Sequence, residues 1–177
     1  NLGSVVKKKY GYRERDETAR SQFRARLTTV DAHHIVYVDE AGIDPRDDYP
    51  YGYCDIGQRF EALKSGQRGD RISWIAGLRE QQLFAPLTFT GTCNRALFEQ
   101  WLSECLIPQL AAGDVIVIDN ASFHYSSDIE AMVKAAGCEL WYLPPYSPDL
   151  NAIEHWWSVL KNWMRQRWEE FEAHETV

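Results

Sequence analysis

Residues 143–161 read LPPYSPDLNAIEHWWSVLK, a proline-dense turn that runs into a helical pattern. The prolines fix their own φ angles and restrict the residues that precede them, so the turn has little conformational freedom. Ser147 before Pro148 fits a helix cap followed by proline at the first helical position, and Asn151 is a second possible cap. The pattern therefore predicts a helix that begins within a few residues of Pro148.

The helix after this turn carries an acid beside an apolar stripe. Spacings of three and four residues place five apolar side chains on one helical face, namely Ile153, Trp156, Trp157, Leu160 and Met164. Glu154 lies one step off that stripe. We therefore expect its carboxylate at the edge of a core, where it can point into a cleft.

The composition fits one domain, with 177 residues of which 45% are hydrophobic and 13% aromatic. Four widely spaced cysteines form no CxxC pair, which argues against zinc and against a disulfide framework. No stretch resembles a signal peptide, and the apolar runs are too short to cross a bilayer. These features predict a cytoplasmic protein without a membrane segment.

Charge is spread unevenly along the chain. Residues 1–30 hold eight Lys or Arg against three Asp or Glu, whereas the whole chain has a net charge of -7. An acidic body with a basic N-terminal arm is not a general nucleic-acid binder by charge alone. Residues 14–27 have a helical pattern. This arm is either a solvated linker helix or a segment that follows DNA phosphates.

The apolar runs predict a mixed α/β sheet with helices on its faces. Strands are expected at 35–38, 51–55, 59–63, 72–78, 83–89, 115–118 and 139–143. Helices are expected at 94–106, 126–136 and after the turn at 143–148, with Asn94 and Ser126 or Ser127 as caps. The spacing of the early strands favours an antiparallel meander.

Two of the apolar strands are followed by an acid, Asp39 after 35–38 and Asp119 after 115–118. Ligand sites in α/β sheets tend to lie beyond the carboxyl ends of strands. If the two strands are neighbours, these carboxylates lie about 5 Å apart and repel each other unless a cation is bound. Oxygen-only ligands favour Mg²⁺ or Mn²⁺. The sequence also allows a simpler interpretation, in which both aspartates are ordinary turn residues and Glu154 is a solvated helix residue.

Three motifs carry a family resemblance: VYVDEAG at 36–42, VIDNASFH at 117–124 and the stretch at 143–161. The second and third motifs place Asp119 and Glu154 with 34 residues between them. In these motifs and their order the chain resembles the catalytic domain of a DDE transposase of the mariner superfamily, in its bacterial insertion-sequence branch. The segment SGQRGDRISWIAGL at 65–78 is also similar to that family.

The resemblance implies a ribonuclease-H-like α/β fold over 31–177, a mixed sheet flanked by helices. Residues 1–30 are then a basic linker that follows an upstream helix-turn-helix DNA-binding domain. Asp39, Asp119 and Glu154 are implied to be the catalytic triad, binding two Mg²⁺ or Mn²⁺ ions. The implied reaction is DNA cleavage at transposon ends and strand transfer into target DNA, and the implied partners are DNA and a second copy of the protein.

Further residues are candidates for supporting or DNA-binding roles. Glu40, Asn120 and His124 are candidates for supporting the three acids. The candidate DNA-binding residues are Lys7, Lys8, Lys9, Arg59 and Lys161. Ala152 stands where many relatives have proline, which leaves the cap of the last helix open. Two rival functions are a nuclease of the same fold without strand transfer, and a non-catalytic DNA-binding or oligomerisation module.

Overall fold

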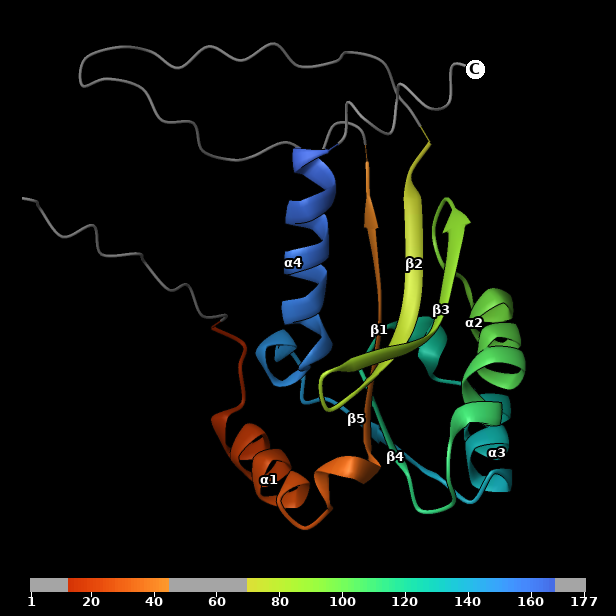
Figure 1. Cartoon of the computed structure of the whole chain (residues 1–177). Coiled ribbons are helices and arrows are strands. Elements are labelled where there is room, and N and C mark those ends of the chain that lie inside the picture. Colours follow the sequence, from red (N-terminus) through yellow and green to blue (C-terminus); the bar gives the residue numbers. More distant parts are fainter. Residues whose placement is uncertain (1–12, 45–69, 168–177) are drawn as a thin grey trace, which may run out of the picture.

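The computed structural model describes residues 13–44 and 70–167 (Figure 1). Its main elements are α1 (Glu17–Leu27), β1 (Ile35–Ile43), β2 (Ile72–Arg79), β3 (Gln82–Thr90), α2 (Arg95–Trp101), β4 (Val115–Ile118), α3 (Ser127–Ala135), β5 (Glu139–Tyr142) and α4 (Ile153–Gln166). The strands expected at 51–55 and 59–63 lie outside the described residues, as do Lys7, Lys8, Lys9 and Arg59.

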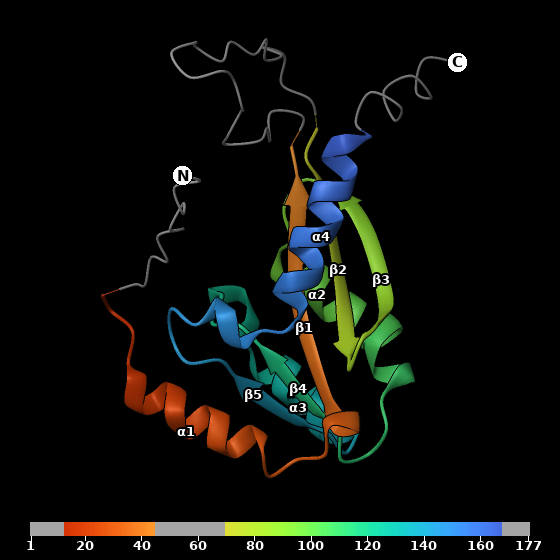
Figure 2. The same ribbon diagram turned by 60° about the vertical axis from the view of Figure 1, so that its left-hand side comes forward.

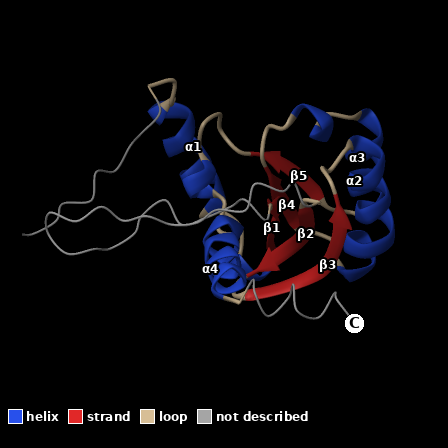
Figure 3. Ribbon diagram, turned by 90° about the horizontal axis from the view of Figure 1, so that it is seen from above, coloured by secondary structure: helices blue, strands red, loops and turns tan. Residues whose placement is uncertain are grey.

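The described strands form one five-stranded sheet in the order β3-β2-β1-β4-β5. The pairs β1–β2 and β2–β3 are antiparallel, whereas β1–β4 and β4–β5 are parallel. Helices α2 and α3 cover one face of the sheet, and α1 and α4 lie on the other (Figure 3). The mixed α/β architecture predicted from the sequence is therefore confirmed, and the predicted antiparallel meander is confirmed for β1, β2 and β3.

Strand β1 is longer than the sequence predicts. Its parallel pairing with β4 covers only Ile35–Tyr37, but its antiparallel pairing with β2 continues to Ile43. Asp39 is opposite Ala76 and lies in the middle of the strand. The prediction that Asp39 follows the end of this strand is wrong, because β2 supplies partners where the Asp-Glu-Ala-Gly sequence favours a turn.

Alternation along β1 divides the core into two layers. Val36 and Val38 pack on the α2 and α3 side, in a cluster with Phe98 and Trp101. Ala41 and Ile43 pack on the α4 side, with the fully buried Ile153. Figure 2 shows α4 lying along β1. The apolar stripe predicted for α4 is confirmed, since all five of its side chains belong to this second cluster.

Neither of the two caps predicted for α4 is formed, although the helix begins only two residues after Asn151. Ser147 precedes a short 3₁₀ turn at Pro148–Leu150, and the α-helix begins only at Ile153. The side chain of Asn151 does not cap the helix: its amide Nδ2 donates a hydrogen bond to the carbonyl of Val38 over 3.3 Å, and its Oδ1 accepts none from the described residues. Ala152 occupies the cap position and has no side-chain acceptor to offer.

The other helices begin close to the predicted residues. Asn94 caps α2 by accepting a hydrogen bond from the Leu97 amide at 3.0 Å, and Ser126 caps α3. The segment after α2 continues through a π-helical turn at Leu102–Leu106 and a 3₁₀ turn at Ile107–Gln109. Together these turns extend the helical surface that packs on β3 and covers this face of the sheet.

Strand β3 contains an irregularity. The β2–β3 register shifts between Ile75 and Gly77, and Ala85 adopts a left-handed φ of 49°. The carbonyl of Ala85 accepts a hydrogen bond from the indole of the buried Trp101 at 2.8 Å, which fixes the bulge against α2. Pro86 follows on the exposed side of the strand.

Helix α1 is a packed element rather than a solvated linker. Phe23 lies edge-on to Trp141 of β5 at 6.4 Å between ring centroids. Arg20 is only 2% exposed, and its guanidinium forms two hydrogen bonds with the Asp149 carboxylate, at 3.0 and 2.7 Å. The N-terminal segment is thus attached to the turn between β5 and α4.

The described thiols of Cys93, Cys105 and Cys138 are free. None of the described helices combines the length and the apolar character that a membrane span requires.

A buried carboxylate holds together the end of the sheet where the β2–β3 hairpin lies. Asp114 is 1% exposed and accepts hydrogen bonds from the Ala111 amide at 2.8 Å, from a guanidinium nitrogen of Arg79, and, at 2.9 Å, from Nδ1 of His34. These partners come from β2, from the residues before β1 and from the loop before β4. The Asp114 side chain therefore joins three segments that are far apart in the sequence.

We predict that Asp114→Ala lowers the free energy of unfolding by about 3 kcal/mol, because it leaves the Arg79 guanidinium without its buried partner. This value is the lower end of the range for a broken buried ion pair, since the Arg79 side chain is 30% exposed. Urea denaturation at neutral pH measures this change. Asp128→Ala, at an exposed position of α3, is the control and should cost less than about 1 kcal/mol. Equal losses in both variants would contradict the role given to Asp114.

We also predict a pH-dependent contribution from the contact between Arg20 and Asp149. The hydrogen bonds from Arg20 hold the pKa of Asp149 below its ordinary value, against a smaller opposing effect of burial. A carboxyl whose pKa is lowered by folding stabilises the protein above its unfolded pKa of about 3.9, and that contribution is lost as pH falls through the folded pKa. The melting temperature of the wild type should therefore decline relative to that of Arg20→Met below about pH 4. A difference that stays constant down to about pH 3 would contradict this prediction.

Candidate active site

Three carboxylates from separate elements line one cavity of about 330 Å³. Asp39 comes from β1, Asp119 follows β4, and Glu154 lies in the first turn of α4. The parallel register of β1 and β4 ends with Tyr37 opposite Val117, so its continuation brings Asp39 level with Asp119. The rest of the lining is formed by residues 120–121 and by the turn at 143–151. The structure therefore brings together the three acids that the sequence singled out.

The carboxylates influence one another. Asp39 is 8% exposed, and its pKa is raised well above the ordinary value, first by burial and then by the charges of Glu154, Glu40 and Asp119. The pKa of Glu154 is raised by burial and by Asp119, against an opposing effect of Lys161. Negative charge is thus concentrated in a partly dehydrated cavity, which is an arrangement that favours a cation.

Asp39 is held by the indole of Trp157. The Nε1 group of Trp157 donates a hydrogen bond to Oδ2 of Asp39 at 3.0 Å, and both residues are buried. This bond fixes the direction of the carboxylate toward the cavity. Sequence reasoning placed Trp157 in the apolar stripe and did not connect it with Asp39. The signal for its second role was its position three residues after Glu154, which puts both side chains on neighbouring positions of the helix.

Asp119 is supported by a histidine that also reaches across the sheet. His124 is fully buried, and its two ring nitrogens contact Asp119 Oδ1 at 2.8 Å and Glu40 Oε1 at 3.0 Å. Burial alone lowers the pKa of His124, but the two carboxylates raise it to about 9. The ring is therefore protonated at neutral pH and donates a hydrogen bond to each acid.

The pKa of Asp119 is shifted in the opposite direction from that of Asp39. Burial tends to raise it, but the hydrogen bonds from His124 and from the Ala121 amide bring it below the ordinary value. Asp119 is consequently ionised across the neutral range. The cavity holds one carboxylate with a fixed negative charge beside another that is costly to ionise without a cation.

Asn120 acts on the turn rather than on Asp119. Its amide Nδ2 donates a hydrogen bond to the carbonyl of Leu143, and its Oδ1 accepts one from the hydroxyl of Tyr125. Tyr125 in turn stacks on Tyr142, with ring centroids 4.5 Å apart and an interplanar angle of 18°. Asn120 therefore links the end of β4 to the start of the turn at 143–151.

Asn151 is a residue whose role sequence reasoning missed. While its Nδ2 is bonded to Val38 next to Asp39, its buried Oδ1 has no hydrogen-bond partner among the described residues. Its backbone carbonyl accepts a hydrogen bond from the Glu154 amide at 3.2 Å. A buried unpaired acceptor in the wall of the cavity is a suitable partner for a water molecule or another donor there.

The oxygen atoms that line this cavity are suitable ligands for a hard divalent cation. The carboxylates of Asp39, Asp119 and Glu154 and the unpaired Oδ1 of Asn151 are all oxygen ligands, the type that Mg²⁺ and Mn²⁺ prefer. In the described ranges 13–44 and 70–167, no three His, Cys, Asp or Glu side chains are close enough to form a preassembled metal centre.

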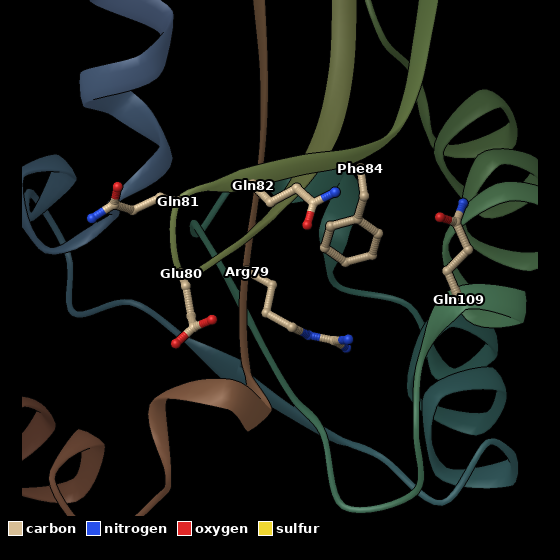
Figure 4. A pocket seen from close by; sticks show the side chains of 6 residues that line it. All are labelled: Arg79, Glu80, Gln81, Gln82, Phe84 and Gln109. Atoms are coloured by element: carbon tan, nitrogen blue, oxygen red, sulfur yellow. The ribbon is translucent and has the colours of Figure 1, made fainter.

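A larger cavity, of about 590 Å³, lies by the hairpin between β2 and β3 (Figure 4). Its lining residues are Arg79, Glu80, Gln81, Gln82, Phe84 and Gln109. The guanidinium of Arg79 is already bonded to Asp114, and the other polar groups are mainly neutral amides. This cavity contains no pair of carboxylates, so the acidic cavity is the candidate active site.

The comparisons with known proteins agree with this assignment. The family described as "DDE superfamily endonuclease" matches residues 34–176. No curated protein matches the chain.

Among solved structures, the Mos1 strand transfer complex matches with a TM-score of 0.68 and 19% identity, covering 91% of this chain and 52% of that one. The mariner Mos1 paired end complex with Mg matches with a TM-score of 0.66 and 16% identity, over 92% and 58% of the two chains. The catalytic domain of Mos1 mariner transposase matches with a TM-score of 0.53 and 14% identity, over 92% and 84%.

The chain spans 52% of the matched chain in the Mos1 strand transfer complex and 59% of that in the Mos1 mariner paired end complex with Mn. At these identities the likeness establishes the fold, which is ribonuclease-H-like, as the sequence predicts. Because the family match covers most of the chain, including all three acids in the cavity, the chain belongs to the DDE superfamily endonucleases.

Proposed function

We propose that this chain is the catalytic domain of a transposase, which cuts DNA at transposon ends and joins the cut end to target DNA. The observation that carries the proposal is the shared cavity of Asp39, Asp119 and Glu154, in a fold that also occurs in the Mos1 strand transfer complex. Carboxylates from a central strand, from the end of its neighbour and from a late helix suit metal-assisted chemistry at a phosphodiester.

The three acids would hold two Mg²⁺ or Mn²⁺ ions. Mos1 structures with Mg and with Mn are among those that match this chain. When bound, such ions neutralise charge at the phosphate and lower the pKa of an attacking water or hydroxyl. The protein's own contribution is orientation, because Trp157 directs Asp39 and His124 keeps Asp119 ionised.

The proposed partners follow from the same assignment. The spacing of 34 residues between Asp119 and Glu154 supports a place in the bacterial insertion-sequence branch, and hence a cytoplasmic protein. DNA and a second copy of the protein would complete the assembly. We further propose that residues 1–30 lead from an upstream helix-turn-helix domain into the catalytic domain at 31–177. Lys161, seven residues after Glu154 on α4, is the described candidate for a phosphate contact.

Two rivals remain distinguishable by experiment. A nuclease of the same fold would cut DNA without producing joined products, so adding a target plasmid and searching for joined molecules separates it from a transposase. A non-catalytic module would show no acid-dependent metal binding. The concentration of negative charge around Asp39 favours a metal-binding enzyme over such a module.

We predict that Asp119→Asn lowers the rate of Mn²⁺-dependent DNA cleavage by roughly 100-fold or more, because loss of a metal ligand removes several kcal/mol of transition-state stabilisation. Nicking of supercoiled plasmid, followed on agarose gels, measures the rate. Asp128→Asn removes an exposed carboxylate from α3 and serves as the matched control. Wild-type nicking by Asp119→Asn would overturn the proposed function.

We predict that Trp157→Phe weakens Mn²⁺ binding by about 10- to 100-fold, the usual cost of removing a hydrogen bond that orients a metal ligand. Phenylalanine retains the packing of the ring but cannot donate to Asp39. Isothermal titration calorimetry measures the affinity. Trp156→Phe changes a partly buried neighbour in the same apolar cluster and should leave the affinity within about twofold of the wild type. Equal affinities in all three proteins would contradict the role of Trp157.

A further inference from the structure

The turn at 143–151 is held by residues from the other end of the described chain. Arg15 and Arg20 both bond to Asp149 of this turn, from positions 134 and 129 residues earlier in the sequence. Neither arginine falls within the family match at 34–176. Figure 2 shows α1 beside this turn.

The contact between Arg20 and Asp149 has the geometry of a specific bond. NH1 of Arg20 lies 3.0 Å from Oδ1 of Asp149 and NH2 lies 2.7 Å from Oδ2, so the two planar groups face each other as a fork. The Arg20 side chain is 3% exposed. An exposed ion pair contributes little to stability, but a fork with a buried guanidinium fixes the orientation of both groups.

Arg15 adds two further contacts to the same turn. Its NH2 group lies 2.9 Å from Oδ1 of Asp149, and its Nε donates a hydrogen bond to the carbonyl of Tyr146, also at 2.9 Å. Tyr146 lines the acidic cavity and has a left-handed φ of 55°. A non-glycine residue in that conformation is costly and persists only where its surroundings fix it. The two arginines supply part of that restraint.

The turn leads directly to the acids. Asn151, two residues after Asp149, bonds through its side chain to the Val38 carbonyl and through its backbone to the Glu154 amide. Leu150 packs beside Phe23 and Leu27 of α1 in one apolar cluster. A displacement of the turn would therefore be transmitted to Glu154 and to the section of β1 that carries Asp39.

We propose that Arg20 is a positioning residue for the active site, which acts through Asp149 and the turn at 143–151 to set the spacing of Glu154 and Asp39. This inference rests on the proposed function of those acids. Helix α1 would then position the wall of the cavity from outside, since it lies before the family match and contributes no residue to the cavity lining.

The test compares Arg20→Met and Arg20→Lys with Arg24→Met, which removes the same charge from an exposed position of the same helix. Arg20→Met should weaken Mn²⁺ binding in calorimetry by roughly 10-fold, the lower end of the range for residues that support metal ligands. It should lower kcat for plasmid nicking by a similar factor while KM for DNA changes by less than about twofold. Arg20→Lys should recover part of the loss, and Arg24→Met should match the wild type.

Each variant is assayed at least about 10 °C below its own melting temperature, so that loss of folded protein does not imitate loss of positioning. Asp149→Asn examines the same contact from the turn, and it should repeat the effects of Arg20→Met. Wild-type Mn²⁺ affinity and kcat in both variants would overturn the inference.

Asp119→Asn separates this failure from a failure of the proposed function. If Asp119→Asn loses metal binding and nicking while Arg20→Met and Asp149→Asn retain them, the positioning role alone is refuted. If Asp119→Asn also retains both, the metal site itself is refuted.

Discussion

The structure depends on keeping a carboxylate in the middle of its central strand. Asp39 is 8% exposed and has β2 on one side and the end of β4 on the other. A charge in such a position is expensive unless hydrogen bonds or a counter-ion compensate for lost hydration. The surrounding elements meet part of this requirement, since α4 contributes an indole donor. The remaining cost of ionising Asp39 is seen in its raised pKa. A cation bound in this cavity would offset that cost.

The two aspartates illustrate how environment sets the state of similar groups. Asp119 lies beside a protonated imidazole and a backbone amide, while Asp39 lies among other acids, so their pKa values move apart. His124 also connects the two faces of the sheet, because Glu40 projects from β1 on the side opposite Asp39. The site is therefore supported by the packing of both core layers.

Much of this could be predicted from the sequence. The period of the apolar residues revealed the described strands, the meander and the stripe of α4, and the order of the motifs pointed to all three acids. The true extent of β1 and the start of α4 could not be predicted, because they depend on partners distant in the sequence. Asp39 remains within a strand only because β2 pairs with it, and the side chain of Asn151, a possible cap in the sequence, is bonded to β1 instead. The docking of α1 escaped prediction for the same reason, since an arginine in a polar helix gives no local sign of a buried partner.

The bulge of β3 affects how the sheet meets other molecules. β3 lies at one edge of the described sheet, and a long flat edge invites another strand to add to it. Ala85 bends this edge with its left-handed backbone, and Pro86 has no N–H group to offer an incoming chain. These two features guard the β3 edge against the addition of a strand from another molecule.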